Sequence, residues 1–143
     1  MTRKRVFISG PITKGNLASN VNNATKAFVD LADAGFAPFC PHWSVYAKES
    51  TSQGNDCLCV GTASGNKTID YETWLDIDFS WIRASHAVLR LPGESSGADK
   101  ELIFAEDHGI PIFYSIDELI AWRKFTNSKT RQCRRTNPLQ NLF

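Results

Sequence analysis

Two acidic residues lie on helix faces that are otherwise apolar or small, and the first of them is Asp78. In an α-helix, the neighbours on one face are three and four positions away. For Asp78 these neighbours are Trp74, Leu75, Trp81 and Ile82. A charge among apolar side chains is costly unless it has a partner or a function. Asp78 is therefore a candidate for proton transfer, and a bond to an indole N–H is the ordinary structural alternative.

The second acidic residue is Glu101, whose helical neighbours are Gly97, Ala98, Phe104 and Ala105. These side chains are small or apolar, and they leave room for a ligand beside the carboxyl group. A glutamate near a helix start also interacts favourably with the helix dipole, which is its ordinary structural explanation. The two carboxylates together suggest a shared chemical site more strongly than either does alone.

A serine- and glycine-rich stretch precedes Glu101. Ser95 and Ser96 come before the predicted helix, and Gly93 and Gly97 allow the backbone to approach a ligand closely. Free N–H groups at a helix start suit a phosphate or another anion. The same groups are expected to favour the ionised form of Glu101, which a nucleophile requires.

Hydrophobic periodicity predicts that strands alternate with helices along the chain. Short β-branched and aromatic runs predict the strands. Asp70 is a suitable N-cap, and Gly35 and Gly109 suit helix ends. Residues 42–67 are rich in Ser, Gly, Asn and Thr, and they predict a long loop. The predicted strands span residues 5–9, 36–41, 86–92 and 110–115, and the predicted helices span residues 19–35, 69–84, 96–109 and 116–125.

This alternation predicts an α/β fold with a parallel sheet. Because crossovers are right-handed, we expect a doubly wound three-layer sandwich, flavodoxin- or Rossmann-like, with four to five strands. In the strand order 2-1-3-4 the winding reverses between the first and third strands, and ligands bind beyond the strand ends at such a reversal. Residues 9–16 (SGPITKGN) and 92–99 (PGESSGAD) are expected to meet there. Both carboxylates should therefore face one cleft.

Length and charge limit the class of protein. A chain of 143 residues suits one core, and we predict an α/β domain over residues 1–124 with a basic extension over residues 125–143. No apolar run reaches membrane-spanning length, and the N-terminus has no signal-peptide core, so we expect a cytoplasmic protein with no membrane partner. From Arg123 onward there are six basic residues and no acidic one. We interpret them as a solvated extension or an oligomer arm, and nucleic-acid binding is the less favoured interpretation.

Cysteine spacing raises the question of a metal site. Cys40 and His42 form C-x-H, Cys57 and Cys59 form C-x-C, and Cys133 is separate. The first four residues have the donor atoms of a tetrahedral zinc site. The usual structural spacing is C-x-x-C, however, so we expect reduced, unliganded thiols. The sequence predicts no metal and no cofactor.

Three segments resemble the nucleoside 2-deoxyribosyltransferase superfamily. They are VFISGPITKGN (6–16), DFSWIRASHAVLRL (78–91) and SSGADKELIFAEDHGIPIF (95–113). The superfamily includes the transferases, the nucleoside 5′-monophosphate N-glycosidases and a further branch that is common in phage and bacterial genomes, which these segments resemble most. The resemblance extends over about residues 5–122.

The resemblance implies roles for individual residues. The superfamily's glutamate nucleophile corresponds to Glu101, and the aspartate that contacts the base and assists proton transfer corresponds to Asp78. The residue six positions before the nucleophile is Ser95, and a serine there favours a 5′-phosphorylated substrate. Trp43 and Tyr46 are candidates to stack on the base or to anchor their loop. Further implied substrate-binding residues are Ser9, Gly10, Pro11, Ile12, Ser96 and Gly97.

The resulting hypothesis is an enzyme that cleaves or transfers the N-glycosidic bond of a nucleoside or a nucleoside 5′-monophosphate. It would be a hydrolase if water accepts the sugar and a transferase if a second base does. One alternative is a non-catalytic module that binds or sequesters a nucleotide on the same fold. Another is a zinc-stabilised interaction protein that uses the cysteines and the basic tail. By resemblance we also expect a homo-oligomer.

Overall fold

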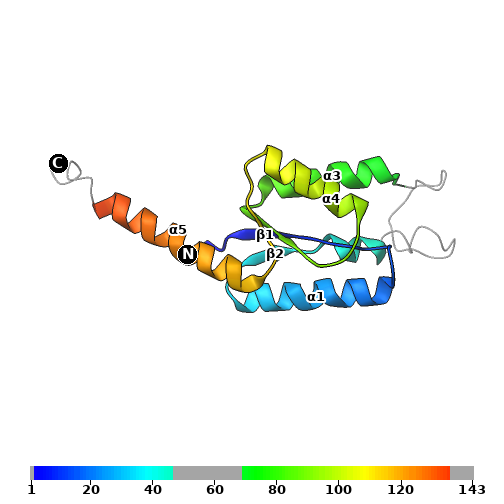
Figure 1. Cartoon of the computed structure of the whole chain (residues 1–143), viewed down its shortest axis with the longest axis horizontal. Coiled ribbons are helices and arrows are strands. Elements are labelled where there is room, and N and C mark those ends of the chain that lie inside the picture. Colours follow the sequence, from blue (N-terminus) through cyan, green and yellow to red (C-terminus); the bar gives the residue numbers. More distant parts are fainter. Residues whose placement is uncertain (1, 47–68, 136–143) are drawn as a thin grey trace, which may run out of the picture.

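The structure is a computed structural model that describes residues 2–46 and 69–135, with side chains described up to residue 129. Strands and helices alternate along the described chain (Figure 1). The part of the predicted long loop that follows residue 46 lies outside the described residues. In chain order the elements are β1 (Arg5–Ser9), α1 (Leu17–Asp33), β2 (Ala37–Phe39), the short 3-10 helix η1 (Pro41–Ser44), α3 (Tyr71–Ala84), β3 (Ala87–Arg90), α4 (Ser96–Asp107), β4 (Ile112–Phe113) and α5 (Ile116–Arg135).

The four described strands form one parallel sheet in the order β2-β1-β3-β4. This confirms the predicted α/β fold with a parallel sheet, and the strand order is the one for which a reversal between the first and third strands was considered. Figure 1 shows α1 on one side of the sheet and α3 and α4 on the other. The winding therefore reverses between β1 and β3, which are neighbours in the middle of the sheet.

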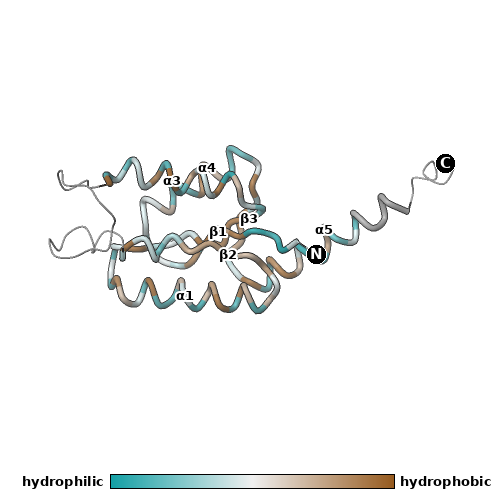
Figure 2. The backbone as a smooth tube through the Cα atoms, turned by 180° about the vertical axis from the view of Figure 1, so that it is seen from behind, coloured by the Kyte–Doolittle hydropathy of each residue, from teal (hydrophilic) through white to brown (hydrophobic). Residues whose placement is uncertain are grey.

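The core has two halves, one on each face of the sheet. Successive strand residues point to opposite faces, so Val6 and Ile8 pack with α1 and with Leu119 of α5, while Phe7 packs with Ile82 of α3 and Ala105 of α4. Figure 2 shows the alternation of hydrophobic and hydrophilic residues along α1 that this burial requires. The doubly wound sandwich follows from apolar side chains on both faces of the central strands.

Local signals fix most helix ends. The side chain of Asn16 accepts a hydrogen bond from the Ser19 amide at the start of α1, and Asp70 caps α3 by accepting from the Thr73 amide, as predicted. Gly35 has a φ of +89°, which stops α1 at the predicted place. These caps set where the loops around the sheet begin.

The last helix is longer than predicted. It was expected to end at Phe125, but α5 continues to Arg135. No glycine or proline interrupts residues 126–135, and Lys129 lies 4.5 Å from the centre of the Phe125 ring one turn earlier. The apolar periodicity ends at Phe125, whereas the helical backbone continues to Arg135. In the described part of the chain, no helix has the length and hydrophobicity needed to cross a membrane.

The loops that follow β1 and β3 touch each other through two glycines. A Cβ on Gly10 would come within 2.9 Å of Leu91 Cβ, and a Cβ on Gly93 would come within 2.8 Å of Pro11 Cγ. Gly93 also has a φ of +116°, which L side chains rarely adopt. Gly93 was expected to let the backbone approach a ligand closely, but it lets the backbone approach Pro11 of the neighbouring loop instead.

Substituting Gly93 should test this contact. We expect Gly93→Ala to lower the free energy of unfolding by about 2–4 kcal/mol, because backbone strain and overpacking add. Gly109→Ala is the matched control, since Gly109 also has a positive φ of +67° but has open space where a Cβ would lie. The control should lose only about 1 kcal/mol. Equal losses in urea denaturation would show that the two loops do not constrain each other.

Candidate active site

A cavity of about 250 Å³ opens beyond the carboxyl ends of the central strands. Ser9 and Arg90, the last residues of β1 and β3, are register partners at this edge of the sheet. The cavity is lined by the loop after β1, by the residues around the end of η1, by one face of α3 and by the start of α4. Its position is the one that the strand order predicts for a ligand site.

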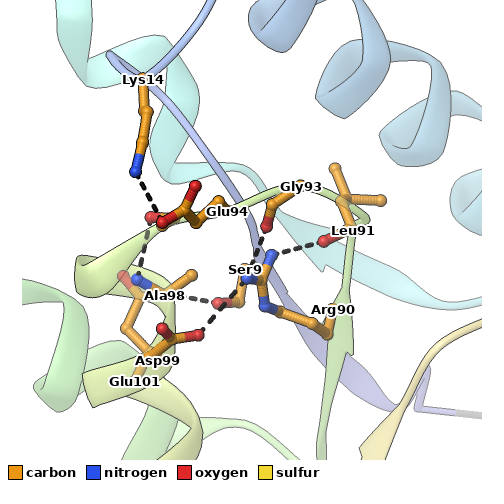
Figure 3. Close-up of polar contacts among 10 residues, drawn as sticks. Ser9, Lys14, Arg90, Leu91, Gly93, Glu94, Ala98, Asp99 and Glu101 are labelled. Atoms are coloured by element: carbon orange, nitrogen blue, oxygen red, sulfur yellow. Dashed lines mark hydrogen bonds and ion pairs between the residues drawn. The ribbon is translucent and has the colours of Figure 1, made fainter.

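Glu101 is buried on the inner face of α4 and lines this cavity. The hydroxyl of Ser9 donates a hydrogen bond of 2.5 Å to its Oε2 (Figure 3). Ser9 itself is fully buried. The carboxyl of Glu101 is therefore hydrogen-bonded to the end of β1 and also lines the cavity.

Asp78 of α3 lines the same cavity and interacts with Glu101, so the two acidic side chains converge as expected. Burial raises the pKa of Asp78 to about 6. Burial also raises the pKa of Glu101 to about 8, and the nearby charge of Asp78 acts in the same direction. The hydrogen bond from Ser9 and the charge of Arg90 lower the pKa of Glu101 but do not offset burial. The two carboxyls titrate as a coupled pair.

This corrects one expectation from the sequence. The amides at the start of α4 were expected to keep Glu101 ionised, but removing its carboxyl from water disfavours the charged form more strongly. Near neutral pH the pair holds one proton between its two members. The raised pKa expected for Asp78 agrees with this environment.

The predicted substrate-binding residues fall into three groups. Gly10, Ile12, Ser95, Ser96 and Gly97 all line the cavity beside the two acids. Ser95 is also the N-cap of α4, and its hydroxyl accepts from the Ala98 amide. The second group, Ser9 and Pro11, does not line the cavity. Ser9 donates to Glu101, and the carbonyl oxygen of Pro11 accepts from His42.

The third group, the two aromatic candidates Trp43 and Tyr46, does not line the cavity. Trp43 is 40% exposed, its indole N–H donates to Thr25 Oγ1 at 3.0 Å, and its ring packs on Phe28 of α1. This is the anchoring role that was the alternative to stacking on a base. Tyr46 is exposed and is likewise not among the cavity residues.

Two aromatic residues that the sequence analysis did not assign line the cavity instead. They are Tyr71 and Trp74, which share one face of α3 with Asp78 at positions i, i+3 and i+7. That spacing is visible in the sequence, where Trp74 entered only as an apolar neighbour of Asp78. Lys14, from the loop after β1, also lines the cavity and pairs with Glu94 at 2.8 Å.

His42 is a buried residue that contacts the loop after β1. It is fully buried, and because a carbonyl oxygen only accepts, its Nε2–H donates to the Pro11 oxygen at 3.1 Å. Burial lowers the pKa of His42 to about 4, so the ring is neutral. Cys57 and Cys59 of the zinc hypothesis lie outside the described residues, and the side chain of Cys133 is not described either. Within residues 2–46 and 69–129, no cluster of His, Cys, Asp and Glu could hold a metal ion.

Comparisons with known proteins give distant structural likenesses. The fold is similar to that of a 2-deoxyribosyltransferase from the psychrotolerant bacterium Bacillus psychrosaccharolyticus, with a TM-score of 0.49 and 17% identity over 76% of this chain and 69% of that chain. No protein-family model and no curated protein matches the chain. Function must therefore be argued from the site itself.

The coupled carboxyls predict how stability depends on pH. Between the unfolded value of 4.5 and about 8, the folded protein retains a proton on Glu101 that the unfolded chain has released. The free energy of unfolding should therefore fall as pH rises through this window, by up to about 1.4 kcal/mol per pH unit for one proton. Glu101→Gln should flatten this slope in urea titrations. The exposed Glu106→Gln on the same helix is the control and should keep the slope. If the free energy of unfolding of Glu101→Gln fell with pH as steeply as that of the unmodified protein, the raised pKa of Glu101 would be contradicted.

Proposed function

We propose that the protein cleaves or transfers the N-glycosidic bond of a nucleoside or a nucleoside 5′-monophosphate. The observation that carries the proposal is the pair of interacting carboxyls, the half-buried Asp78 and the buried Glu101, on one cavity at the reversal of the sheet. Glycosidic cleavage needs this combination, because one carboxylate must meet the sugar cation while a second group protonates the leaving base. A pair that shares one proton supplies both forms at neutral pH.

In the first step, Glu101 acts as the nucleophile. A base bound against Asp78 draws the shared proton toward Asp78, and Glu101 is left as the carboxylate. A carboxylate oxygen of Glu101 attacks the anomeric carbon, while the hydroxyl of Ser9 donates to Oε2 and holds the carboxylate in place. The carbon–nitrogen bond breaks, its electron pair goes to the base nitrogen, and Asp78 gives that nitrogen the proton. The products are a glycosyl ester on Glu101 and a free base.

In the second step, an acceptor releases the sugar from Glu101. Asp78, now ionised, takes a proton from a water molecule or from the nitrogen of a second base as that acceptor attacks the anomeric carbon. Water as acceptor makes the reaction a hydrolysis, and a base makes it a transfer. Either acceptor restores the pair with one proton.

A 5′-phosphate has a candidate subsite at the start of α4. Ser95, Ser96 and Gly97 line the cavity there, and a helix N-terminus favours an anion. Lys14 lines the cavity from the facing loop and adds a positive charge. Its ion pair with Glu94 is exposed and therefore weak, so a phosphate can compete for the ammonium group.

The base is assigned to the aromatic face of α3. Trp74 lies one helical turn before Asp78, so a planar ring hydrogen-bonded to the carboxyl also reaches the indole. Tyr71 lies one turn earlier on the same face of the helix. The homo-oligomer, the cytoplasmic location and the domain boundary after residue 124 stay predictions.

Activity measurements test the proposal directly. We expect the purified protein to release free base from a panel of 2′-deoxynucleosides and their 5′-monophosphates, followed by chromatography with and without an acceptor base. Glu101→Gln should lower kcat at least about 10³-fold, and Asp78→Asn about 10²–10⁴-fold. The exposed Glu106→Gln serves as the matched control and should retain full activity. No turnover across the panel, together with tight nucleotide binding that survives Glu101→Gln, would favour the non-catalytic module.

The aromatic assignment has its own test. Trp74→Ala should raise KM about tenfold, since stacking contributes about 1–3 kcal/mol per base. Trp43→Ala is the matched control, because Trp43 packs on α1 and does not line the cavity. Its KM should stay close to that of the unmodified protein. If the two variants weaken binding equally, the base does not lie against α3.

A further inference from the structure

Arg90 is a buried cation beneath the candidate site. It is the last residue of β3, and its side chain is only 9% exposed. A buried charge is costly unless its hydrogen-bonding groups are satisfied or it serves a neighbouring charge. Its place next to Ser9 in the sheet puts it beside the residue that supports Glu101.

The guanidinium holds the loop between β3 and α4. Nη1 donates to the carbonyl oxygen of Leu91, and Nη2 donates to that of Gly93 at 2.9 Å. Nη2 also lies 3.5 Å from Asp99 Oδ1 in the first turn of α4. Figure 3 shows Arg90 in contact with Leu91 and Gly93 of the loop and with Asp99 of α4. A planar fork with several donors can make these contacts together, whereas a lysine ammonium cannot.

The same charge acts on Glu101. Ser9 from β1, Asp78 from α3 and Arg90 from β3 act on this carboxyl, and Lys14, from the loop after β1, brings a further charge to its cavity. Among them, Arg90 is the buried cation whose charge interacts with Glu101 and lowers its pKa. It therefore opposes the effects of burial and of Asp78.

We propose that Arg90 is a positioning residue that fixes the loop between β3 and α4 against the first turn of α4 and that, as the buried cation beside Ser9 in the sheet, favours the ionised form of Glu101. Its relevance to catalysis rests on the function proposed above, but its effect on the pair does not. The hydrogen bonds of the guanidinium fix the geometry of the loop, and its positive charge lowers the pKa of Glu101. The two parts of this role are separable, because lysine retains the charge without the fork.

Carboxyl titration tests the charge without any assay of activity. The probe is the side-chain carboxyl of Glu101, followed by carbon-13 NMR and assigned by its absence in Glu101→Gln. In Arg90→Met we expect its titration midpoint to rise by on the order of half a pH unit or more. In Arg90→Lys the midpoint should stay near that of the unmodified protein. In Asp99→Asn, which removes the outer ion pair and keeps Arg90, it should stay there too. A folded Arg90→Met with an unchanged or lower midpoint overturns the proposal.

Hydrogen exchange tests the hydrogen bonds that the Arg90 guanidinium makes to the loop. It uses Arg90→Lys, so the test still applies if Arg90→Met does not fold. The amides of Ala98 and Asp99 begin α4 and bond to Ser95 Oγ and Ser95 O. In Arg90→Lys they should exchange at least about tenfold faster, because the preceding loop has lost its anchor. Unchanged protection there overturns the positioning role. If the Glu101 midpoint responds to Arg90→Met while no substrate is turned over, the proposed function fails and the role of Arg90 stands.

Discussion

The carboxyl of Glu101, removed from water and placed against that of Asp78, is the constraint on which the site depends. Burial raises the pKa of both acids, so the pair keeps one proton near neutral pH. In water both groups would ionise well below pH 7, and no proton donor would remain. The low polarity of the surroundings therefore supplies the chemistry that the two side chains alone lack.

Keeping such a pair buried requires a rigid edge of the sheet. The glycine contacts bring the loops after β1 and β3 together, with Gly10 against Leu91 and Gly93 against Pro11. Arg90 ties the second loop to the strand that it leaves. Packing, hydrogen bonding and charge therefore act on the same short segment beside the two acids.

The elements were predictable where local patterns and tertiary packing agree. β1 and β3 are short apolar runs buried on both faces, and Asp70 is a local cap. The end of α5 was missed because the apolar period stops before the backbone does. Base stacking had been sought in Trp43 and Tyr46, whereas the aromatic residues on the cavity lie on α3.

The sequence by itself determined the alternation of strands and helices, the parallel α/β fold and the two acids on apolar helix faces, because apolar periodicity and right-handed crossovers leave few other arrangements. Only the tertiary structure decided which state of Glu101 prevails and which aromatic face lines the cavity. Helix-start amides act locally and are visible in the sequence. Desolvation is a sum over every element that covers the carboxyl, and it exists only once they have packed together.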